Sequence, residues 1–309
     1  MLLFIADSHC DTLYALEFEN ISGGAIMSSK DKLEKGGVSL QTFALFAGSR
    51  EYMHTPYENA LRMLKRANSI GIPFYTGNLP DNPPDQVSGI FSIEGGQVLE
   101  GKLERLFEFD RICRIRMISL TWNYENEIGY PAKINNTIGL KPFGLSLLME
   151  MDRLGIYADV SHLNEAGFWD VCENAKLPPI ASHSNAYELA DSYRNLKKNQ
   201  IEAIIKRNGY IGVNFYPYFL TRREDAQISD IIRHIDYIAS LGGIDVLGLG
   251  SDFDGIEVQP EGLKDASQMG NLIDALLKSN YTEDQVKGIA GMNFWRLLKN
   301  AEVVREQNR

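Results

Sequence analysis

The chain has few of the features that mark secreted, disulfide-bonded or membrane-embedded proteins. It contains only three cysteines, Cys10, Cys113 and Cys172, an odd number with no paired spacing. This fits a reducing compartment better than a disulfide framework. No apolar run approaches the roughly 20 residues of a membrane-spanning helix, and the N-terminal residues lack the basic segment of a secretory signal. We therefore expect a soluble, cytoplasmic protein with no membrane partner.

Positive charge is also scarce. The 31 lysines and arginines are outnumbered by 41 aspartates and glutamates, the net charge is −10, and no basic run stands out. This balance argues against a nucleic-acid partner held through phosphate contacts. Apolar residues, by contrast, make up 44% of the 309 residues, enough for a sizeable core. There is no internal repeat, low-complexity segment or break in composition, so residues 1–309 are predicted to form one domain.

Short apolar segments alternate with segments of helical periodicity along the chain. The predicted strands are residues 2–11, 37–47, 88–93, 114–120, 156–160, 179–181, 210–215 and 245–249. The predicted helices are residues 57–70, 99–109, 142–153, 164–173, 200–207, 228–240, 266–279 and 282–299, and residues 12–20 are predicted to form a helix or a turn. Eight strands that alternate with helices favour a (β/α)8 TIM barrel, and an open doubly wound sheet is the competing α/β arrangement.

Residue types that commonly bind metals lie at the ends of successive predicted strands. Side chains two apart in an extended chain point to the same side, so a histidine and an aspartate at the end of the first strand project together. The full set is His9 and Asp11 on the first strand, Glu94 after the third, His162 after the fifth, His183 after the sixth and Asp252 after the eighth. In a parallel barrel these strand ends lie on one rim. Each residue alone has an ordinary explanation as a polar turn, whereas one metal site accounts for all six.

The number of donors predicts a pair of metal ions. Three histidines and three carboxylates exceed the four donors of one tetrahedral zinc. Two ions about 3.5–4 Å apart, bridged by a carboxylate and a water, account for the six donor side chains better than one ion does. Glu94 is the natural bridge because its longer side chain reaches both ions. His9 and Asp11 then hold one Zn²⁺ ion and His162 and His183 the other, with other divalent metals as the alternative.

Asp252 remains free for proton transfer in this scheme. It takes a proton from the bridging water and passes it to the leaving group. Two cations lower the pKa of that water toward neutrality, which gives a hydroxide nucleophile. The remaining histidines, His54 and His234, fall in helical or loop contexts and are predicted to be structural.

Five segments carry these polar strand ends. They are residues 7–12 (Asp-Ser-His-Cys-Asp-Thr), 92–95 (Ser-Ile-Glu-Gly), 159–162 (Asp-Val-Ser-His), 181–186 (Ala-Ser-His-Ser-Asn-Ala) and 248–255 (Gly-Leu-Gly-Ser-Asp-Phe-Asp-Gly). In this order they resemble the membrane dipeptidase (renal dipeptidase) family, peptidase family M19, and the resemblance covers nearly the whole chain. It implies a binuclear zinc enzyme that hydrolyses dipeptides, often with a D-residue at the C-terminal position. It also implies that Arg194 holds the free carboxylate of the substrate, and it suggests a homodimer.

One segment departs from the family pattern. After the fourth strand the animal enzymes have Leu-Thr-His, with the histidine near the developing oxyanion, whereas this chain has Trp122 in that place. An indole has one donor and no acceptor, and its bulk reshapes the pocket. Either Asn123, Tyr124 or Asn126 supplies the missing donor, or the metal ions stabilise the oxyanion alone. Trp122 and Asn126 are therefore candidate substrate-binding residues.

These observations predict a zinc-dependent dipeptidase in which a metal-bridging hydroxide attacks the peptide carbonyl of a dipeptide. A binuclear hydrolase of another small amide, a cyclic amide or a lactone keeps the same metals and is the first alternative. A barrel that binds a small molecule without turnover is the second alternative, and the complete set of ligands argues against it.

Overall fold

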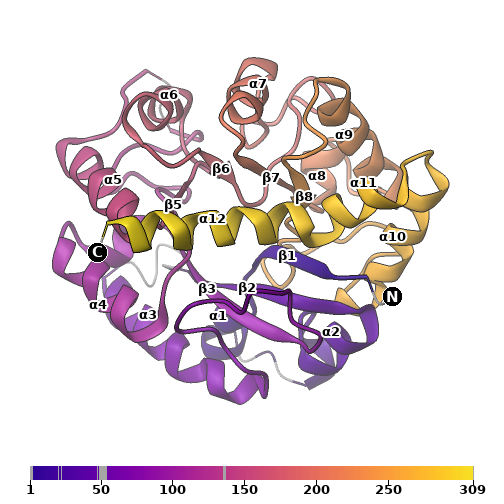
Figure 1. Cartoon of the computed structure of the whole chain (residues 1–309), viewed down its shortest axis with the longest axis horizontal. Helices are drawn as coiled ribbons and strands as arrows, with labels where there is room; N and C mark the ends of the chain where they lie inside the picture. Colours follow the sequence, from indigo (N-terminus) through magenta and orange to yellow (C-terminus); the bar gives the residue numbers. More distant parts are fainter. Residues whose placement is uncertain are drawn as a thin grey trace.

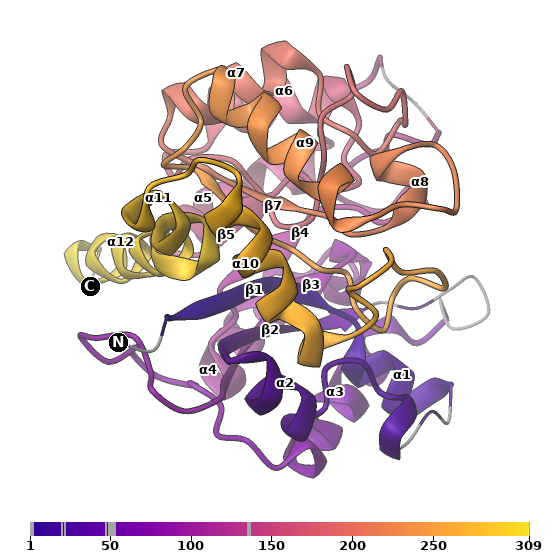
Figure 2. The same cartoon turned by 90° about the vertical axis from the view of Figure 1, so that its right-hand side faces the viewer.

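The computed structural model describes residues 3–19, 21, 23–46, 48, 54–134 and 137–308. Within these residues, eight parallel strands close into a barrel in sequence order (Figure 1 and Figure 2). The strands are β1 (Ile5–Cys10), β2 (Val38–Phe46), β3 (Ser88–Glu94), β4 (Met117–Ser119), β5 (Tyr157–Asp159), β6 (Ile180–Ala181), β7 (Tyr210–Val213) and β8 (Leu247–Leu249). The predicted TIM barrel is confirmed. Three residues of the predicted elements, Leu2, Asn20 and Ala47, lie outside the described residues.

Helices connect the strands and surround most of the barrel (Figure 1). They are α1 (Thr12–Phe18), α2 (Lys30–Gly36), α3 (Pro56–Arg66), α4 (Leu103–Cys113), α5 (Pro142–Leu154), α6 (Glu165–Asn174), α7 (Lys198–Lys206), α8 (Pro217–Leu220), α9 (Ile228–Ser240), α10 (Met269–Lys278), α11 (Glu283–Lys287) and α12 (Asn293–Gln307). In the part of the chain that the structure describes, none of them has the length and apolar character needed to cross a membrane.

Some helices differ from the prediction for local reasons. The helix predicted at 99–109 begins later, as α4, because Glu100 and Gly101 adopt positive φ angles of 47° and 67° and end a preceding 3-10 turn. The helix predicted at 282–299 is divided into α11 and α12 by a π-helical turn at Gly288–Met292. α2 and α8 are not among the predicted helices, since α2 buries only Leu33 and Gly36 and α8 is a single turn.

Apolar side chains close the barrel at the end where its strands begin. Met117, Tyr157 and Tyr210 are the first residues of β4, β5 and β7, and they share one buried cluster with Phe294 of α12. The hydroxyl of Tyr157 donates to the carbonyl oxygen of Leu297 at 2.7 Å. α12 lies across this end of the barrel (Figure 1), so the barrel has a sealed floor.

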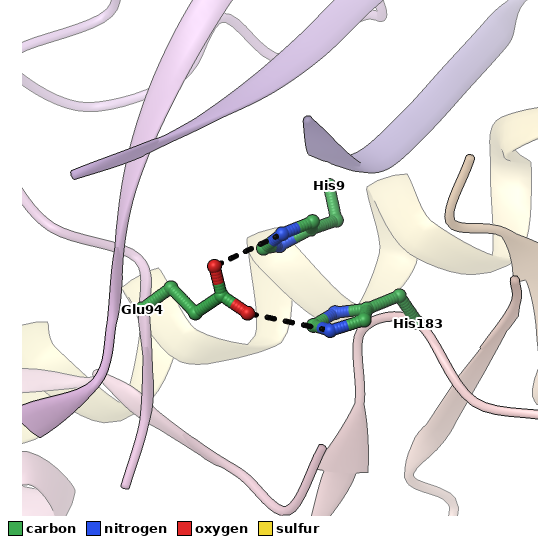
Figure 3. A group of neighbouring side chains, drawn as sticks. All are labelled: His9, Glu94 and His183. Atoms are coloured by element: carbon green, nitrogen blue, oxygen red, sulfur yellow. Dashed lines mark ion pairs between the residues drawn. The ribbon is translucent and has the colours of Figure 1, made fainter. Parts of the chain in front are cut away.

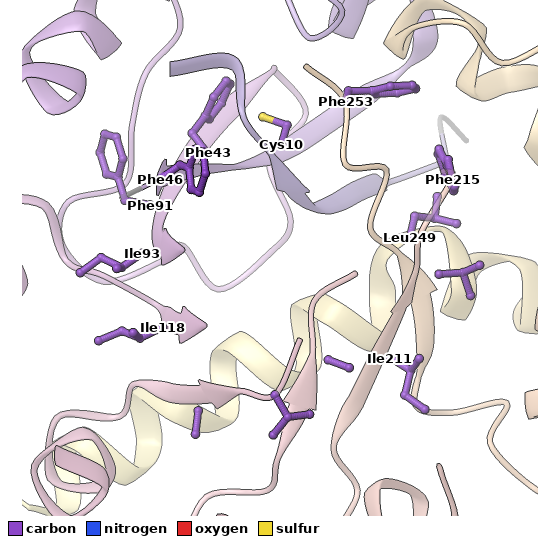
Figure 4. Packing of buried hydrophobic residues seen from close by; sticks show 14 of the residues in the cluster. Cys10, Phe43, Phe46, Phe91, Ile93, Ile118, Ile211, Phe215, Leu249 and Phe253 are labelled. Atoms are coloured by element: carbon purple, nitrogen blue, oxygen red, sulfur yellow. The ribbon is translucent and has the colours of Figure 1, made fainter. Parts of the chain in front are cut away.

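A second, larger cluster fills the space around the strands. Figure 4 shows part of it, including Phe43, Phe91 and Ile118. Full burial of side chains of this size stabilises the fold by roughly 1.5–3 kcal/mol each. Because the floor and the outer layer are apolar, the opposite mouth of the barrel is where polar strand ends gather, as in other barrels of this kind.

Candidate metal centre

The six predicted metal-site residues all lie at the mouth where the strands end. His9 and Glu94 are within the last two residues of β1 and β3, and Asp11 follows β1 directly. His183 lies two residues beyond β6, and His162 and Asp252 lie three residues beyond β5 and β8. All six side chains are buried. Figure 3 shows how His9, Glu94 and His183 point toward one another from separate strands.

Glu94 lies between two groups of donors. Its Oε2 atom is 3.6 Å from Nε2 of His9. Its Oε1 atom is 3.1 Å from Nε2 of His162 and 3.6 Å from Nε2 of His183. The two oxygens of one carboxylate therefore face different histidines, which is the arrangement expected of a bridging ligand.

The donors on the Oε2 side are completed by two more carboxylates. Nε2 of His9 lies 3.5 Å from Oδ2 of Asp11 and 3.7 Å from Oδ1 of Asp252. Nε2 of His9 and Oδ1 of Asp11 are buried and have no hydrogen-bond partner. Buried polar atoms are normally paired, so these two atoms are free to act as ligands of a cation. Both sides of Glu94 offer the nitrogen and oxygen donors that suit zinc.

The electrostatics of the described residues also favour a cation here. Burial lowers the pKa values of His162 and His183 well below their usual range, so both rings are neutral at neutral pH. Their Nε2 atoms are 3.2 Å apart. Burial, together with the nearby Glu94 carboxylate, raises the pKa of Asp11 to about 6. Burial also raises the pKa of Asp252 to about 7, with Asp11 and Glu94 adding to the shift and His9 opposing it.

Two of the site residues have unusual backbone conformations. His162 and Asp252 adopt φ angles of 69° and 64°, a left-handed conformation that costs a non-glycine residue roughly 1–2 kcal/mol. Both follow a strand closely, and both side chains line the cavity at the mouth. Gly255 allows a close approach nearby, because a Cβ atom on it would lie 2.1 Å from Oδ2 of Asp11.

A cavity of about 640 Å³ opens beside the Glu94 carboxylate. Asp11, His162 and Asp252 line it together with Glu94. Much of the remaining wall is aromatic and includes Tyr14, Phe46, Trp122, Tyr193, Tyr216 and Phe219. A second cavity of about 240 Å³ adjoins the first, since His162 and Tyr193 line both of them.

Arg194 lines the smaller cavity rather than the larger one. Its side chain is only 4% exposed, Nη2 donates to the carbonyl oxygen of His183 at 3.4 Å, and Nε has no partner. The guanidinium carbon lies 5.4 Å from the centroid of the Phe219 ring, which belongs to the wall of the larger cavity. A buried guanidinium with a free N–H is a ready site for a carboxylate.

The structure separates the roles of the residues that follow β4. Trp122 lines the larger cavity, packs edge-on against Phe46 at 4.8 Å, and lies 6.2 Å from the ring of His162. Asn126 does not line the cavity. Its Nδ2 atom donates to the carbonyl oxygen of Leu120 at 2.8 Å and to Oε1 of Gln97 at 3.2 Å.

The carbonyl end of Asn126 is occupied as well. Its Oδ1 atom accepts from the backbone N–H groups of Ile128 and Gly129 at 2.9 and 3.1 Å. Both ends of the amide are therefore used within the protein, and Asn126 shapes the segment between β4 and α5 instead of reaching toward a substrate. Asn123 does line the cavity, and its Oδ1 atom lies 3.3 Å from Nδ1 of His162.

Sequence reasoning did not identify the residues that support the site. Asp7, Asp159, Ser182 and Ser251 are buried directly behind the six residues. One signal for them was present in the sequence, because a serine directly precedes His9, His162, His183 and Asp252. His234 is structural as predicted: its Nδ1 atom accepts from the backbone N–H of Ala186 at 3.1 Å.

The model of the membrane dipeptidase family, peptidase family M19, matches residues 2–309. The chain belongs to this family. As an M19 member it is a metallo-dipeptidase. The chain is 36% identical over 218 residues to the uncharacterized protein in the pqqA 5′ region of Klebsiella pneumoniae, a match that covers 67% of this chain and 80% of that protein.

Further likeness comes from a yeast protein and from solved structures. The chain is 36% identical to an uncharacterized dipeptidase of Schizosaccharomyces pombe, over 62% of this chain but only 47% of that protein. A metallo peptidase from Rhodobacter sphaeroides, solved with a phosphinate mimic of the dipeptide L-Ala-D-Ala, has a TM-score of 0.87 at 24% identity and covers 97% of this chain and 100% of its own. A probable dipeptidase from Pseudomonas aeruginosa has a TM-score of 0.85 at 18% identity, with 98% and 96% coverage. These structures share the barrel fold of this chain.

Proposed function

We propose that this M19 metallo-dipeptidase uses two zinc ions to hydrolyse the peptide bond of dipeptides, including dipeptides with a D-residue at the C-terminal position. The observation that carries the proposal is the position of Glu94, whose two oxygens face His9 on one side and His162 and His183 on the other. The site opens into a cavity that adjoins the buried Arg194 guanidinium. The phosphinate-dipeptide complex of the Rhodobacter sphaeroides relative supports the choice of substrate.

The residues present fit two divalent ions. His9, Asp11 and Oε2 of Glu94 would hold one ion, and His162, His183 and Oε1 of Glu94 the other. When bound, such ions polarise a carbonyl oxygen and lower the pKa of water toward neutrality. The neutral state of His162 and His183 leaves their lone pairs available for coordination.

Asp252 is proposed to move the proton. Its Oδ2 atom accepts from Nδ2 of Asn214 at 2.8 Å, which orients the carboxylate. Its Oδ1 atom faces the His9 side of the site, and the side chain lines the cavity. Oδ1 takes the proton of the attacking water and delivers it to the amine that leaves. A carboxylate that is fixed at one oxygen and faces the site with the other is suited to both steps.

Arg194 and the aromatic wall are proposed to bind the rest of the dipeptide. The guanidinium holds the terminal carboxylate, which places the peptide bond toward Glu94. Trp122 and Phe46 form one side of the larger cavity and pack against the substrate side chain. No part of this proposal assigns substrate contact to Asn126, because its amide is fully hydrogen-bonded within the protein.

The zinc-loaded protein is expected to hydrolyse L-Ala-D-Ala, and removal of the metals with a chelator is expected to lower kcat/KM by at least about 1000-fold. The reason is that Lewis-acid chemistry supplies several kcal/mol of the catalysis. A panel of L,L- and L,D-dipeptides, cyclic amides and lactones is assayed before chelation, after chelation and after zinc is restored. Turnover of cyclic amides or lactones without turnover of any dipeptide would contradict the proposal.

Metal uptake is expected to depend on pH. Without metal, Asp11 and Asp252 have pKa values raised to about 6 and about 7, so at lower pH an ion must displace their protons. The apparent zinc affinity should therefore increase as the pH rises from about 5.5 to 7.5, by up to about tenfold per pH unit for each proton displaced. Competition with a chelator of known proton linkage measures this affinity. An affinity that does not change across the range would mean that these carboxylates are already ionised.

A further inference from the structure

A buried aspartate behind the metal centre receives four hydrogen bonds. Oδ1 of Asp159 accepts from the backbone N–H groups of Ser161 and Ser182 at 3.0 and 2.9 Å. Oδ2 accepts from the hydroxyl of Ser182 at 2.5 Å and from the hydroxyl of Ser119. The backbone N–H groups can only donate, and the two hydroxyls are placed to donate as well, so all four contacts suit a carboxylate. Asp159 is therefore a buried acceptor of four hydrogen bonds at the end of β5.

The Ser182 hydroxyl connects Asp159 to a histidine of the candidate metal centre. Its Oγ atom lies 2.7 Å from Nδ1 of His183. The single hydroxyl hydrogen is already given to Asp159, so the hydroxyl can only accept from the ring. Nδ1 of His183 therefore carries the proton, and the Nε2 lone pair points toward Oε1 of Glu94 and Nε2 of His162.

The same device occurs a second time on the opposite side of the site. Oδ1 of Asp7 accepts from the backbone N–H of Ser251 at 2.8 Å, and Oδ2 accepts from the Ser251 hydroxyl at 2.5 Å. Ser251 directly precedes Asp252, as Ser182 directly precedes His183. In both places a buried aspartate binds the N–H and the hydroxyl of a serine at a strand end, but only Ser182 also contacts a histidine ring.

We propose that Asp159 and Ser182 are positioning residues that form a carboxylate–hydroxyl–histidine relay, which selects the tautomer of His183 and strengthens its hold on one metal ion. The inference rests on the proposed two-metal function. His162 has a different support, since its Nδ1 atom faces the neutral amide of Asn123 at the longer distance of 3.3 Å. The relay therefore makes His183 the more firmly oriented of the two histidines on this side.

Ser182→Ala is the test, and Ser119→Ala is its matched control. Both variants remove one hydroxyl from the same oxygen of Asp159, but only Ser182 touches His183. Zinc affinity is measured for both ions by chelator competition, and the Nδ1–H signal of His183 is followed by proton NMR in the metal-free protein. We expect Ser182→Ala to weaken one of the two ions by roughly 10–100-fold and to remove the signal. Ser119→Ala should leave both affinities within about threefold and keep the signal.

Other outcomes have distinct meanings. Equal effects of the two serine variants, or equal weakening of both ions, would overturn the relay. If Ser182→Ala does not fold, Asp159→Asn tests the same point, because it keeps the shape of the side chain but removes the charge. The same selective loss of one ion is then expected, and unchanged binding would overturn the relay. Failure of the wild-type protein to bind two zinc ions would instead overturn the proposed function.

Discussion

Glu94→Ala is expected to remove both metal ions and to lower kcat/KM for dipeptides by at least about 1000-fold. The two oxygens of Glu94 face the two groups of donors, so its loss is expected to weaken both positions together. The measurement is the zinc content per chain after dialysis, together with the rate of L-Ala-D-Ala hydrolysis. Glu104→Ala is the control, because Glu104 is an exposed residue of α4 and its loss should change neither quantity.

A graded series strengthens this test. His162→Ala should abolish activity and release the ion on the Oε1 side of Glu94 only, whereas His54→Ala should change neither metal content nor activity, since His54 is exposed and outside the site. Retention of both ions by Glu94→Ala, with normal activity, would show that Glu94 is not a bridge. Equal metal content in His162→Ala and His54→Ala would remove His162 from the set of ligands.

Arg194→Ala is expected to raise KM for dipeptides by about 10–100-fold with a smaller change in kcat. Hydrogen bonds to charged groups each contribute about 1.5–3 kcal/mol, and the guanidinium has an unpartnered Nε–H in a buried cavity. Steady-state kinetics with dipeptides of one series measure the effect. The melting temperature of the zinc-loaded variant shows whether the loss of a buried side chain has also disturbed the fold.

A dipeptide amide provides the matched substrate for this prediction. It lacks the terminal carboxylate, so the wild-type enzyme should bind it weakly and Arg194→Ala should bind it equally weakly. Arg194→Lys keeps the charge but not the planar fork, and should recover only part of the affinity. An unchanged KM for the free dipeptide in Arg194→Ala would mean that the carboxylate is held elsewhere.

The barrel and the positions of the six site residues were predictable because both follow from regular features of the chain. Short apolar strand segments that alternate with helices favour a parallel barrel, and a parallel barrel brings all strand ends to one mouth. His9 and His183 are far apart in sequence, yet each lies 3.6 Å from a different oxygen of Glu94. The order of the strands alone was enough to predict that these residues meet at one mouth of the barrel.

Other features depend on contacts that no sequence pattern specifies. The start of α4 depends on two residues with positive φ, and the π-helical turn that separates α11 from α12 interrupts a segment predicted as one helix. Asn126 was a reasonable candidate donor until its four internal hydrogen bonds were seen. The partnership of Asp159 with Ser182 joins two strands through side-chain geometry, and only the structure brings them together.

The apolar packing at the closed end of the barrel has a consequence for substrate entry and product release. Tyr157, Tyr210 and Phe294 are fully buried at the end of the barrel opposite the candidate metal centre, whereas the cavity lined by Glu94 and Asp252 opens at the mouth. Under the proposed function, the dipeptide enters and both amino acids leave through this mouth. If Arg194 holds the carboxylate as proposed, the product that it retains must leave before the next dipeptide binds, so product release adds to the time of each turnover.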